Sequence, residues 1–382
     1  MTIVTDIEDL RRLAQRRVPK MFYDYVDTGS WSQSTYRDNE AALRRQRVRQ
    51  RVAVNIDNRS LATKMIGQDV TMPVALAPVG LTGMQHADGE ILAAQAAEEF
   101  GVPYTLTTMS VCSIEDVAAH TKNPFWFQLY VMRDRGFVKS LLQRAKDAGC
   151  SALVLTLDLQ FIGQRHRDIK NGLSTPPKIT PKFIFEMMIK PRWCMKMLGT
   201  KRHSFGNIVG HVSGVEDMGS LSEWTAKQFD RTLDWSSIDW IREHWDGKLI
   251  LKGIDDVEDA KIAAGMGADA MIVSNHGGRQ LDGAPASYDM LAPIVDAVGD
   301  KTEIHFDSGI RSGQDVFKAM AAGAKGTFIG RSYVYGLGAM GKAGVTKALQ
   351  IIHDELDGTM ALCGETDIHN VGRHNLYDGV RD

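Results

Sequence analysis

The segment SNHGGRQLDG at residues 274–283 combines a histidine, two glycines and an arginine directly after an apolar run at 270–273. The run predicts a buried strand, which places His276 at the strand end. His276 can act as a base near neutral pH, and Arg279 can hold a carboxylate through two parallel hydrogen bonds. The glycines allow a tight turn and a close approach to a ligand. A lone histidine at a strand end is more often structural, so the catalytic interpretation depends on the polar residues that accompany it.

Asp158 and Arg165 could complete such a site. Asp158 follows the apolar run at 152–157, where its carboxylate could orient His276 and stabilise the imidazolium; the alternative is an aspartate that caps the next helix. Arg165 lies in GQRHRD and could supply a second guanidinium to an anionic substrate, whereas a surface salt bridge is the alternative for any single arginine. With His276 and Arg279, these residues predict a base beside a carboxylate-binding pair.

Two segments in the last quarter of the chain predict a phosphate site. DSGIRSG at 307–313 and GTFIGR at 326–331 each place a glycine, which exposes its backbone N–H, shortly before an arginine. These glycines and arginines predict a bound cofactor that carries phosphate. They are Gly309, Arg311, Gly330 and Arg331.

Further polar residues lie near the ends of expected strands. Lys252 would point its ammonium into the same region, where a fixed cation could stabilise the negative charge of a reduced flavin. Gln128 and Thr156 carry groups suited to a pyrimidine edge, or else make ordinary hydrogen bonds between strands. In contrast, GLGAMG at 336–341 matches GxGxxG without the preceding strand and βαβ unit that a dinucleotide site requires, so we do not expect it to bind NAD.

Short β-rich runs alternate with helical stretches along most of the chain. Several helices end in glycine followed at once by a strand, as in AKDAGCSALVLTLD and MAAGAKGTFIGR. Asp255 and Asp256 mark the start of a helix expected to carry Ile262 and Ala263 inward. This alternation predicts an α/β fold, a (β/α)₈ TIM barrel with its active site at the C-terminal ends of the strands. The expected strands are residues 74–78, 104–108, 126–130, 152–158, 249–253, 270–276, 303–309 and 326–330.

Two parts of the chain are additional to the strands and helices that a minimal barrel needs. Within one expected domain over residues 1–382, an N-terminal helical and extended section precedes a barrel at about 71–355. A long insertion at about 173–220 separates the fourth strand from the fifth. Its stretch 178–202 carries seven Lys or Arg against one Glu, with Phe, Met and Trp residues interleaved, which indicates an amphipathic, basic segment.

Composition limits the classes of protein to consider. With 382 residues and 43% hydrophobic residues the chain can bury a large core, and its formal net charge of −2 argues against a general nucleic-acid binder. The four cysteines lie far apart and form no CxxC pair, so we expect neither disulfides nor a metal site, as in a reducing cytosol. The charged N-terminus has no apolar leader, and no run is long enough to span a membrane.

Over nearly the whole chain the sequence resembles the FMN-dependent α-hydroxy-acid dehydrogenase and oxidase family. The resemblance is carried by the segments SNHGGRQLDG, DSGIRSG, WFQLY, LTLD and PKMFYDY. Within this family, the bacterial respiratory L-lactate dehydrogenases are most similar to three further segments, MPVALAPVGLTGM, TLTTMSVCSIEDV and FQLYVMRDRGF. The resemblance implies FMN as the cofactor and a homotetramer.

The resemblance also implies roles for residues at matching positions. His276 is then the base, Asp158 its partner, and Tyr130 the group that bonds the substrate oxygen. The residues around the substrate carboxylate are Tyr25, Arg165 and Arg279. Those expected around FMN are Ala77, Pro78, Val79, Gly80, Thr107, Gln128, Thr156, Lys252, Ser274, Asp307, Gly309, Arg311, Gly330 and Arg331.

Two departures from the oxidases of this family bear on the electron acceptor and the substrate. Gly80 stands where plant-type oxidases carry the alanine of a Pro-Thr-Ala turn, which resembles the dehydrogenases and favours an acceptor other than oxygen. Met109 replaces an aromatic residue common in the oxidases and changes the wall of the pocket.

These observations predict FMN-dependent oxidation of an L-2-hydroxy acid, L-lactate to pyruvate, with electrons passed to a quinone-type acceptor. The basic insertion suggests a cytoplasmic protein that is peripheral on the inner face of the cell membrane; a solvated flap over the active site is the alternative. Three other functions stay open: a mandelate-type dehydrogenase, a soluble glycolate-type oxidase that produces hydrogen peroxide, and a non-enzymatic barrel that binds a phosphate ligand.

Overall fold

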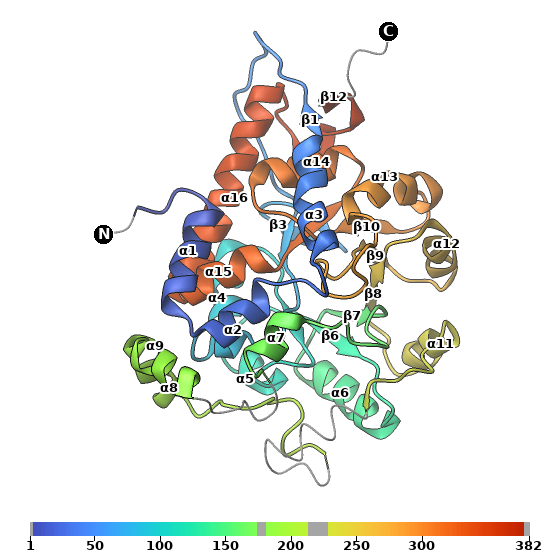
Figure 1. Cartoon of the computed structure of the whole chain (residues 1–382). Coiled ribbons are helices and arrows are strands. Elements are labelled where there is room, and N and C mark those ends of the chain that lie inside the picture. Colours follow the sequence, from blue (N-terminus) through green and yellow to red (C-terminus); the bar gives the residue numbers. More distant parts are fainter. Residues whose placement is uncertain (1–2, 174–180, 213–227, 378–382) are drawn as a thin grey trace.

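A computed structural model describes residues 3–173, 181–212 and 228–377 (Figure 1). The helices are α1 (Ile7–Arg17), α2 (Lys20–Val26), α3 (Ser34–Arg45), α4 (Gly89–Phe100), α5 (Ile114–Ala118), α6 (Arg135–Asp147), α7 (His166–Lys170), α8 (Pro181–Met188), α9 (Pro191–Leu198), α11 (Ser236–Arg242), α12 (Val257–Gly265), α13 (Ser287–Val298), α14 (Gly313–Ala321), α15 (Arg331–Met340) and α16 (Lys342–Cys363). The strands are β1 (Arg47–Val48), β2 (Thr63–Met65), β3 (Gln68–Val70), β4 (Val74–Leu76), β5 (Thr105–Thr107), β6 (Trp126–Tyr130), β7 (Ala152–Thr156), β8 (Lys248–Ile254), β9 (Ala270–Val273), β10 (Glu303–Phe306), β11 (Gly326–Ile329) and β12 (Leu376–Tyr377).

Eight strands form the parallel sheet that the sequence predicts. They pair in the order β4-β11-β10-β9-β8-β7-β6-β5. The sheet closes on itself because Leu76 of β4 makes a parallel bridge to Tyr104, just before β5. The predicted (β/α)₈ barrel is therefore confirmed, and each expected strand is present. Several end earlier than expected: β9 ends at Val273 and β10 at Phe306, because His276, Ser308 and Gly309 adopt positive φ.

The β2–β3 hairpin closes the barrel at the end where the strands begin. Met65, Ile66 and Val70 of this hairpin belong to the same buried cluster as inward-facing barrel residues such as Trp126 and Phe328. The backbone N–H of Ile66 also donates to the carboxylate of Glu303, the first residue of β10, at 3.0 Å. Ligands must therefore reach the barrel from its other end.

The outer helices bury one face each against the sheet or against one another. In α12, Ala260 and Ala263 are buried, but Ile262 is 44% exposed. The expectation that Ile262 points inward was wrong. Ile262 sits one residue from Ala263, about 100° around the helix, and lies outside the face that Ala260 and Ala263 bury.

The described part of the insertion contains two short helices, α8 and α9, joined near Lys190. In Figure 1 they form a hairpin at the lower left edge of the molecule, away from the barrel strands. Residues 178–180 of the predicted basic segment, and 174–177 and 213–220 of the insertion, lie outside the described residues. None of the described helices is long and apolar enough to cross a membrane.

Candidate active site

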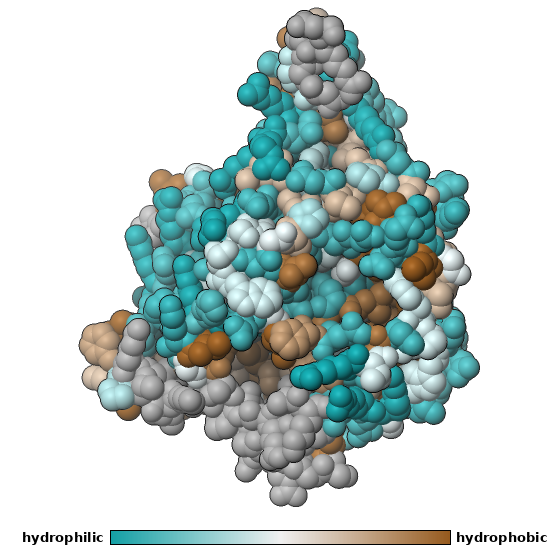
Figure 2. Space-filling model, turned by 45° about the vertical axis from the view of Figure 1, so that its right-hand side comes forward, coloured by the Kyte–Doolittle hydropathy of each residue, from teal (hydrophilic) through white to brown (hydrophobic). Residues whose placement is uncertain are grey.

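A cavity of about 400 Å³ opens at the ends of the barrel strands. Its walls come from α2, from the loops that follow β4, β7, β9 and β10, and from the start of α15. The volume is in the range of small-molecule and cofactor sites. Figure 2 shows a hollow with hydrophobic surface in the lower half of the molecule. Most of the catalytic, substrate-binding and cofactor-binding residues predicted from the sequence line this cavity.

His276 and Asp158 lie together at this cavity although 118 residues separate them. His276 Nδ1 is 2.8 Å from Asp158 Oδ1. Because a carboxylate only accepts hydrogen bonds, Nδ1 carries the proton and Nε2 is left with a free lone pair. His276 lines the cavity, so Nε2 can act there as a base. Of the two readings open for Asp158, this contact supports the partner of His276.

Burial controls the protonation of this pair. Burial lowers the pKa of His276 below its ordinary value of 6.5, and the nearby cations Lys252 and Arg165 lower it further, although Asp158 opposes them. Burial would raise the pKa of Asp158, but the charge and hydrogen bond of His276 and the charge of Lys252 hold it below its ordinary value of 3.8. At neutral pH the structure therefore presents a neutral imidazole beside an ionised carboxylate.

Two glycines allow close approaches around the site, Gly253 to Asp158 and Gly278 to the backbone of α3. A Cβ at Gly253, which has φ +97, would lie 2.7 Å from Asp158 Cγ, and one at Gly278 would lie 2.4 Å from Tyr36 N. The sequence pointed to Gly278 through the HGGR segment but gave no reason to single out Gly253 inside an expected strand. Only the approach of Asp158 from the neighbouring strand explains it.

Two partly buried arginines line the cavity and have unpaired N–H groups. Arg279 donates through Nη1 to the carbonyl oxygens of Tyr25 and Thr28, and its guanidinium lies 4.6 Å from the centroid of the Tyr25 ring. Arg279 Nη2 and Arg165 Nε are buried without a hydrogen-bond partner in the described structure. Burial lowers the pKa of Arg279, and the positive charge of Arg165 lowers it further. Two guanidinium groups that line one cavity, each with a free donor, are suited to bind an anion.

Tyr130, at the end of β6, lines the same cavity and its ring packs edge-on against Phe229. Burial raises the pKa of Tyr130, and the negative charge of Asp158 raises it further. Its hydroxyl therefore stays protonated and can donate a hydrogen bond to a substrate oxygen.

Most of the residues expected around the cofactor line the cavity. Those that do are Ala77, Pro78, Val79, Gly80, Lys252, Asp307, Gly309, Arg311, Gly330 and Arg331. Those absent from its wall, Thr107, Gln128, Thr156 and Ser274, form a buried layer of hydrogen bonds. Thr107 donates to Gln128 at 2.6 Å, Gln128 donates to Thr156 at 3.0 Å, and Lys252 donates to Ser274 at 2.7 Å. Gln128 and Thr156 thus make hydrogen bonds between strands, and their role at the cofactor stays a prediction.

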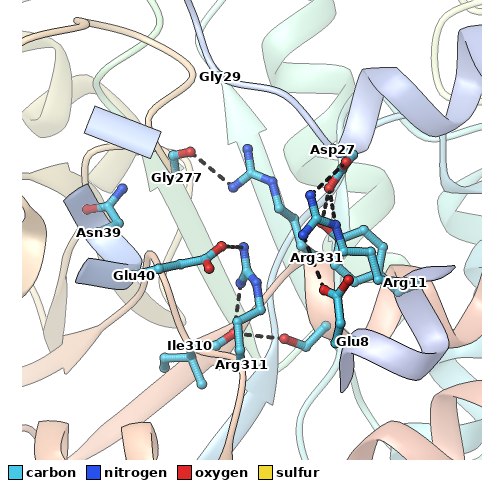
Figure 3. A network of polar contacts seen from close by, with 12 residues as sticks. Glu8, Arg11, Asp27, Gly29, Asn39, Glu40, Gly277, Ile310, Arg311 and Arg331 are labelled. Carbon is cyan, nitrogen blue, oxygen red and sulfur yellow. Dashed lines mark hydrogen bonds and ion pairs between the residues drawn. The ribbon is translucent and has the colours of Figure 1, made fainter. Parts of the chain in front are cut away.

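Arg311 and Arg331 differ in how their charge is balanced (Figure 3). Glu40 of α3 points at Arg311, with 3.2 Å between Glu40 Oε1 and Arg311 Nη2. Arg331 donates only to carbonyl oxygens, those of Val26, Gly277 and Thr28, at 2.7 to 3.0 Å. Burial, together with the charge of Arg311, lowers the pKa of Arg331. Among the described residues Arg331 has no carboxylate partner, and it lines the cavity together with Gly309 and Gly330, so a phosphate group could be bound there.

The N-terminal section builds one wall of the site, which the sequence did not indicate beyond Tyr25. The carbonyl groups of residues 25–28 accept hydrogen bonds from both Arg279 and Arg331. This segment is held by Asp27, which is bound by Arg11 through two nitrogens and by the hydroxyls of Tyr23 and Tyr335. The Arg11–Asp27 pair is visible at the right of Figure 3.

Comparison with known proteins identifies the family. A family model described as FMN-dependent dehydrogenase matches residues 14–378. The chain belongs to the FMN-dependent dehydrogenase family. Within related sequences, it is 44% identical to the L-lactate dehydrogenase of Pseudomonas syringae pv. syringae (strain B728a) over 380 residues, which are 99% of this chain and 100% of that relative. It is also 44% identical to the L-lactate dehydrogenase of Caulobacter vibrioides (strain NA1000 / CB15N) over 384 residues, 99% of each chain.

Solved structures of the family share the fold over the whole chain. The crystal structure of the monotopic membrane protein (S)-mandelate dehydrogenase is 33% identical, with a TM-score of 0.95, covering 99% of this chain and 100% of that one. A mandelate oxidase with (S)-4-hydroxymandelic acid is 33% identical, with a TM-score of 0.84 and 98% of each chain covered. As a member of this family the protein is an FMN-dependent dehydrogenase, and its cavity offers the phosphate and ring environment that FMN requires.

Proposed function

We propose that the protein oxidises L-lactate to pyruvate and passes the electrons to a quinone-type acceptor. The observation that carries the substrate class is the convergence, in one cavity, of the His276–Asp158 pair with the free N–H groups of Arg279 and Arg165. This combination suits a substrate that has both a carboxylate and a proton to be removed. The relatives named L-lactate dehydrogenase, at 44% identity over the full chain, support lactate among the 2-hydroxy acids.

The chain's own groups divide the reaction between binding and proton transfer. Arg279, Arg165 and Tyr25 bind the substrate carboxylate, and the protonated Tyr130 hydroxyl donates to the substrate oxygen. His276 accepts through Nε2 the proton that leaves the substrate, and Asp158 stabilises the imidazolium that forms. FMN, when bound, supplies the chemistry of accepting two electrons from the substrate. The residues proposed to hold it are those of the 77–80 turn, Lys252, and the Arg311–Arg331 region.

An anaerobic titration of the purified holoenzyme with L-lactate tests this proposal. We expect L-lactate to bleach the flavin absorbance, with slow recovery when air is admitted and fast recovery with a quinone analogue. Bleaching without recovery by quinone would contradict the acceptor, and rapid recovery in air with peroxide formation would identify an oxidase. Absence of bleaching by L-lactate would contradict the substrate.

A mandelate-type dehydrogenase is the second candidate because the cavity wall is strongly apolar near the base. Met109, Leu159, Phe205 and Phe229 all line it. An apolar wall of this kind suits the aromatic side chain of a substrate such as mandelate. The structural relatives include (S)-mandelate dehydrogenase. The same titration with (S)-mandelate separates the two: the preferred substrate is the one with the larger rate of bleaching at low concentration.

We propose further that α8 and α9 lie on an anionic membrane surface, on the inner face of the cell membrane. Their exposed side chains include Phe185, Met188 and Leu198, which are 61%, 73% and 85% exposed. Lysine and arginine residues flank them in the sequence. A surface with apolar side chains among cations suits the headgroup region of an anionic bilayer.

The hairpin of α8 and α9 contacts residues that line the cavity. Trp193 of α9 stacks on Phe22, with 5.5 Å between ring centroids, and donates to the carbonyl oxygen of Met84 at 3.0 Å. Both Phe22 and Met84 line the cavity. This proximity supports a lipid-soluble acceptor that approaches from the membrane side.

A homotetramer remains part of the proposal, to be checked by light scattering.

Replacing Phe185 and Met188 together with glutamate is expected to abolish co-sedimentation with anionic vesicles at low salt. The change removes apolar surface and adds negative charge, and both effects oppose binding to an anionic bilayer. The matched control is Leu362→Glu, since Leu362 is 63% exposed on α16, far from this hairpin. Equal sedimentation of the double variant and the control, or no sedimentation of the unmodified protein, would contradict membrane docking.

A further inference from the structure

Asp168 is a buried carboxylate in the cavity that the proposed mechanism does not use. It lies on α7, is 8% exposed, and lines the cavity wall. Its Oδ1 atom has no hydrogen-bond partner in the described structure. A buried, unpaired carboxylate oxygen is costly, so its position calls for an explanation.

The charges around Asp168 come from three elements. Arg279, in the loop after β9, and Arg165, at the start of α7, are the two cations that act on it. From α2, Asp24 faces it, and Asp24 is itself bound to Lys20 and to Asn171. The cavity wall thus carries two free donors and one free acceptor. These are Arg279 Nη2, Arg165 Nε and Asp168 Oδ1. Each arginine is therefore under the influence of a carboxylate before any substrate arrives.

We propose that Asp168 and the substrate carboxylate compete for the Arg165–Arg279 pair, so that binding of the anion is accompanied by protonation of Asp168. This inference rests on the proposed function, because it needs an anionic substrate at the two arginines. The proton comes from solvent, and no bond of the substrate is changed. Asp168 is then a positioning residue that makes carboxylate affinity depend on pH.

The direction of the pH dependence follows from linkage. Burial raises the pKa of Asp168 above its ordinary value of 3.8, Arg279 and Arg165 oppose this, and Asp24 adds to it. A second anion on the same arginines raises it further. The complex therefore holds more protons than the free protein between the two pKa values of Asp168, and affinity for an anion falls as pH rises through that interval.

The test is to measure the binding of oxalate, an unreactive dicarboxylate, to the oxidised holoenzyme. Binding is monitored through the change in flavin absorbance. We expect the Kd of the unmodified protein to rise about tenfold as pH rises through the interval between the two pKa values of Asp168, which corresponds to a shift of about one pKa unit on binding. Asp168→Glu should keep this dependence. Asp168→Asn should lose most of it, with tight binding at pH 8. Asp354→Asn, an exposed carboxylate on α16, serves as the control and should match the unmodified protein.

His276 also titrates near this site and must be separated from Asp168. In His276→Ala holoenzyme, calorimetry of oxalate binding in two buffers of different ionisation enthalpy should still report proton uptake. This readout does not depend on whether Asp168→Asn folds. Loss of proton uptake in His276→Ala, or an unchanged pH profile in Asp168→Asn, would overturn the inference while leaving the proposed function intact. If the unmodified holoenzyme bound no oxalate and was not reduced by L-lactate, the proposed function would fail, and this inference with it.

Discussion

Replacing His276 with alanine is expected to slow the reduction of bound flavin by L-lactate by about 10³- to 10⁴-fold, at the upper end of what a positioned base contributes. The imidazole is neutral at pH 7 because burial lowers its pKa, and Asp158 at 2.8 Å stabilises the charge that it acquires. No other described residue combines these features in the cavity. Anaerobic stopped-flow absorbance measures the rate directly.

The flavin content of the His276→Ala variant is expected to stay normal, since the cofactor contacts proposed above come from other residues. His353→Ala, a change on the partly exposed surface of α16, is the matched control. In the unmodified protein, kcat/KM should fall as pH falls through the pKa of His276, which lies below 6.5, because the imidazolium cannot accept a proton. Near-normal bleaching of His276→Ala with full FMN content would contradict the assignment of the base.

Replacing Arg279 with alanine is expected to lower kcat/KM for L-lactate by roughly 30-fold to several thousand-fold, the range set by about 2–5 kcal/mol for losing one partner of a buried charge pair. Arg279 lines the cavity and its buried Nη2 atom has no partner in the described structure, so a substrate carboxylate bound there would gain a charge-assisted hydrogen bond. Steady-state kinetics with a soluble acceptor gives the value.

Arg279→Lys should recover only part of the loss, because an ammonium cannot reproduce the fork that reaches Tyr25 and Thr28 on one side and the cavity on the other. Arg45→Ala, at a side chain that is 62% exposed on α3, controls for the removal of a positive charge. Thermal unfolding should accompany the kinetics, since Arg279 also ties the N-terminal section to the barrel. An unchanged KM in a folded Arg279→Ala variant would show that the carboxylate binds elsewhere.

The sequence was sufficient for the barrel because its signals are local. Each strand is a short apolar run, and several of the preceding helices end at or just before a glycine, so the alternation can be read residue by residue. The strand ends were less certain, because the turns at His276 and Ser308 depend on positive φ angles that the surrounding loops impose. The direction of Ile262 was misjudged for a similar reason: periodicity within α12 allowed more than one face to be chosen.

The site depended on contacts that no local pattern contains. The sequence offered Asp158 either as a helix cap or as the partner of His276, and only closure of the barrel brings the two side chains to 2.8 Å. Gly253 and Asp168 had no signal of their own. Gly253 makes room for Asp158, and Asp168 is influenced by Arg165 at the start of its own helix and by Arg279 from a different loop.

The amino-acid sequence thus determined the kinds of chemistry available, a base, two guanidinium groups and glycine-rich phosphate turns, because residue type and short spacing carry that information. The tertiary structure decided which of them meet, and it placed the carbonyl groups of residues 25–28 against Arg279 and Arg331. Such contacts span about 250 to 300 residues. They arise from the packing of the N-terminal helices over the barrel mouth, which is a property of the whole fold rather than of any segment.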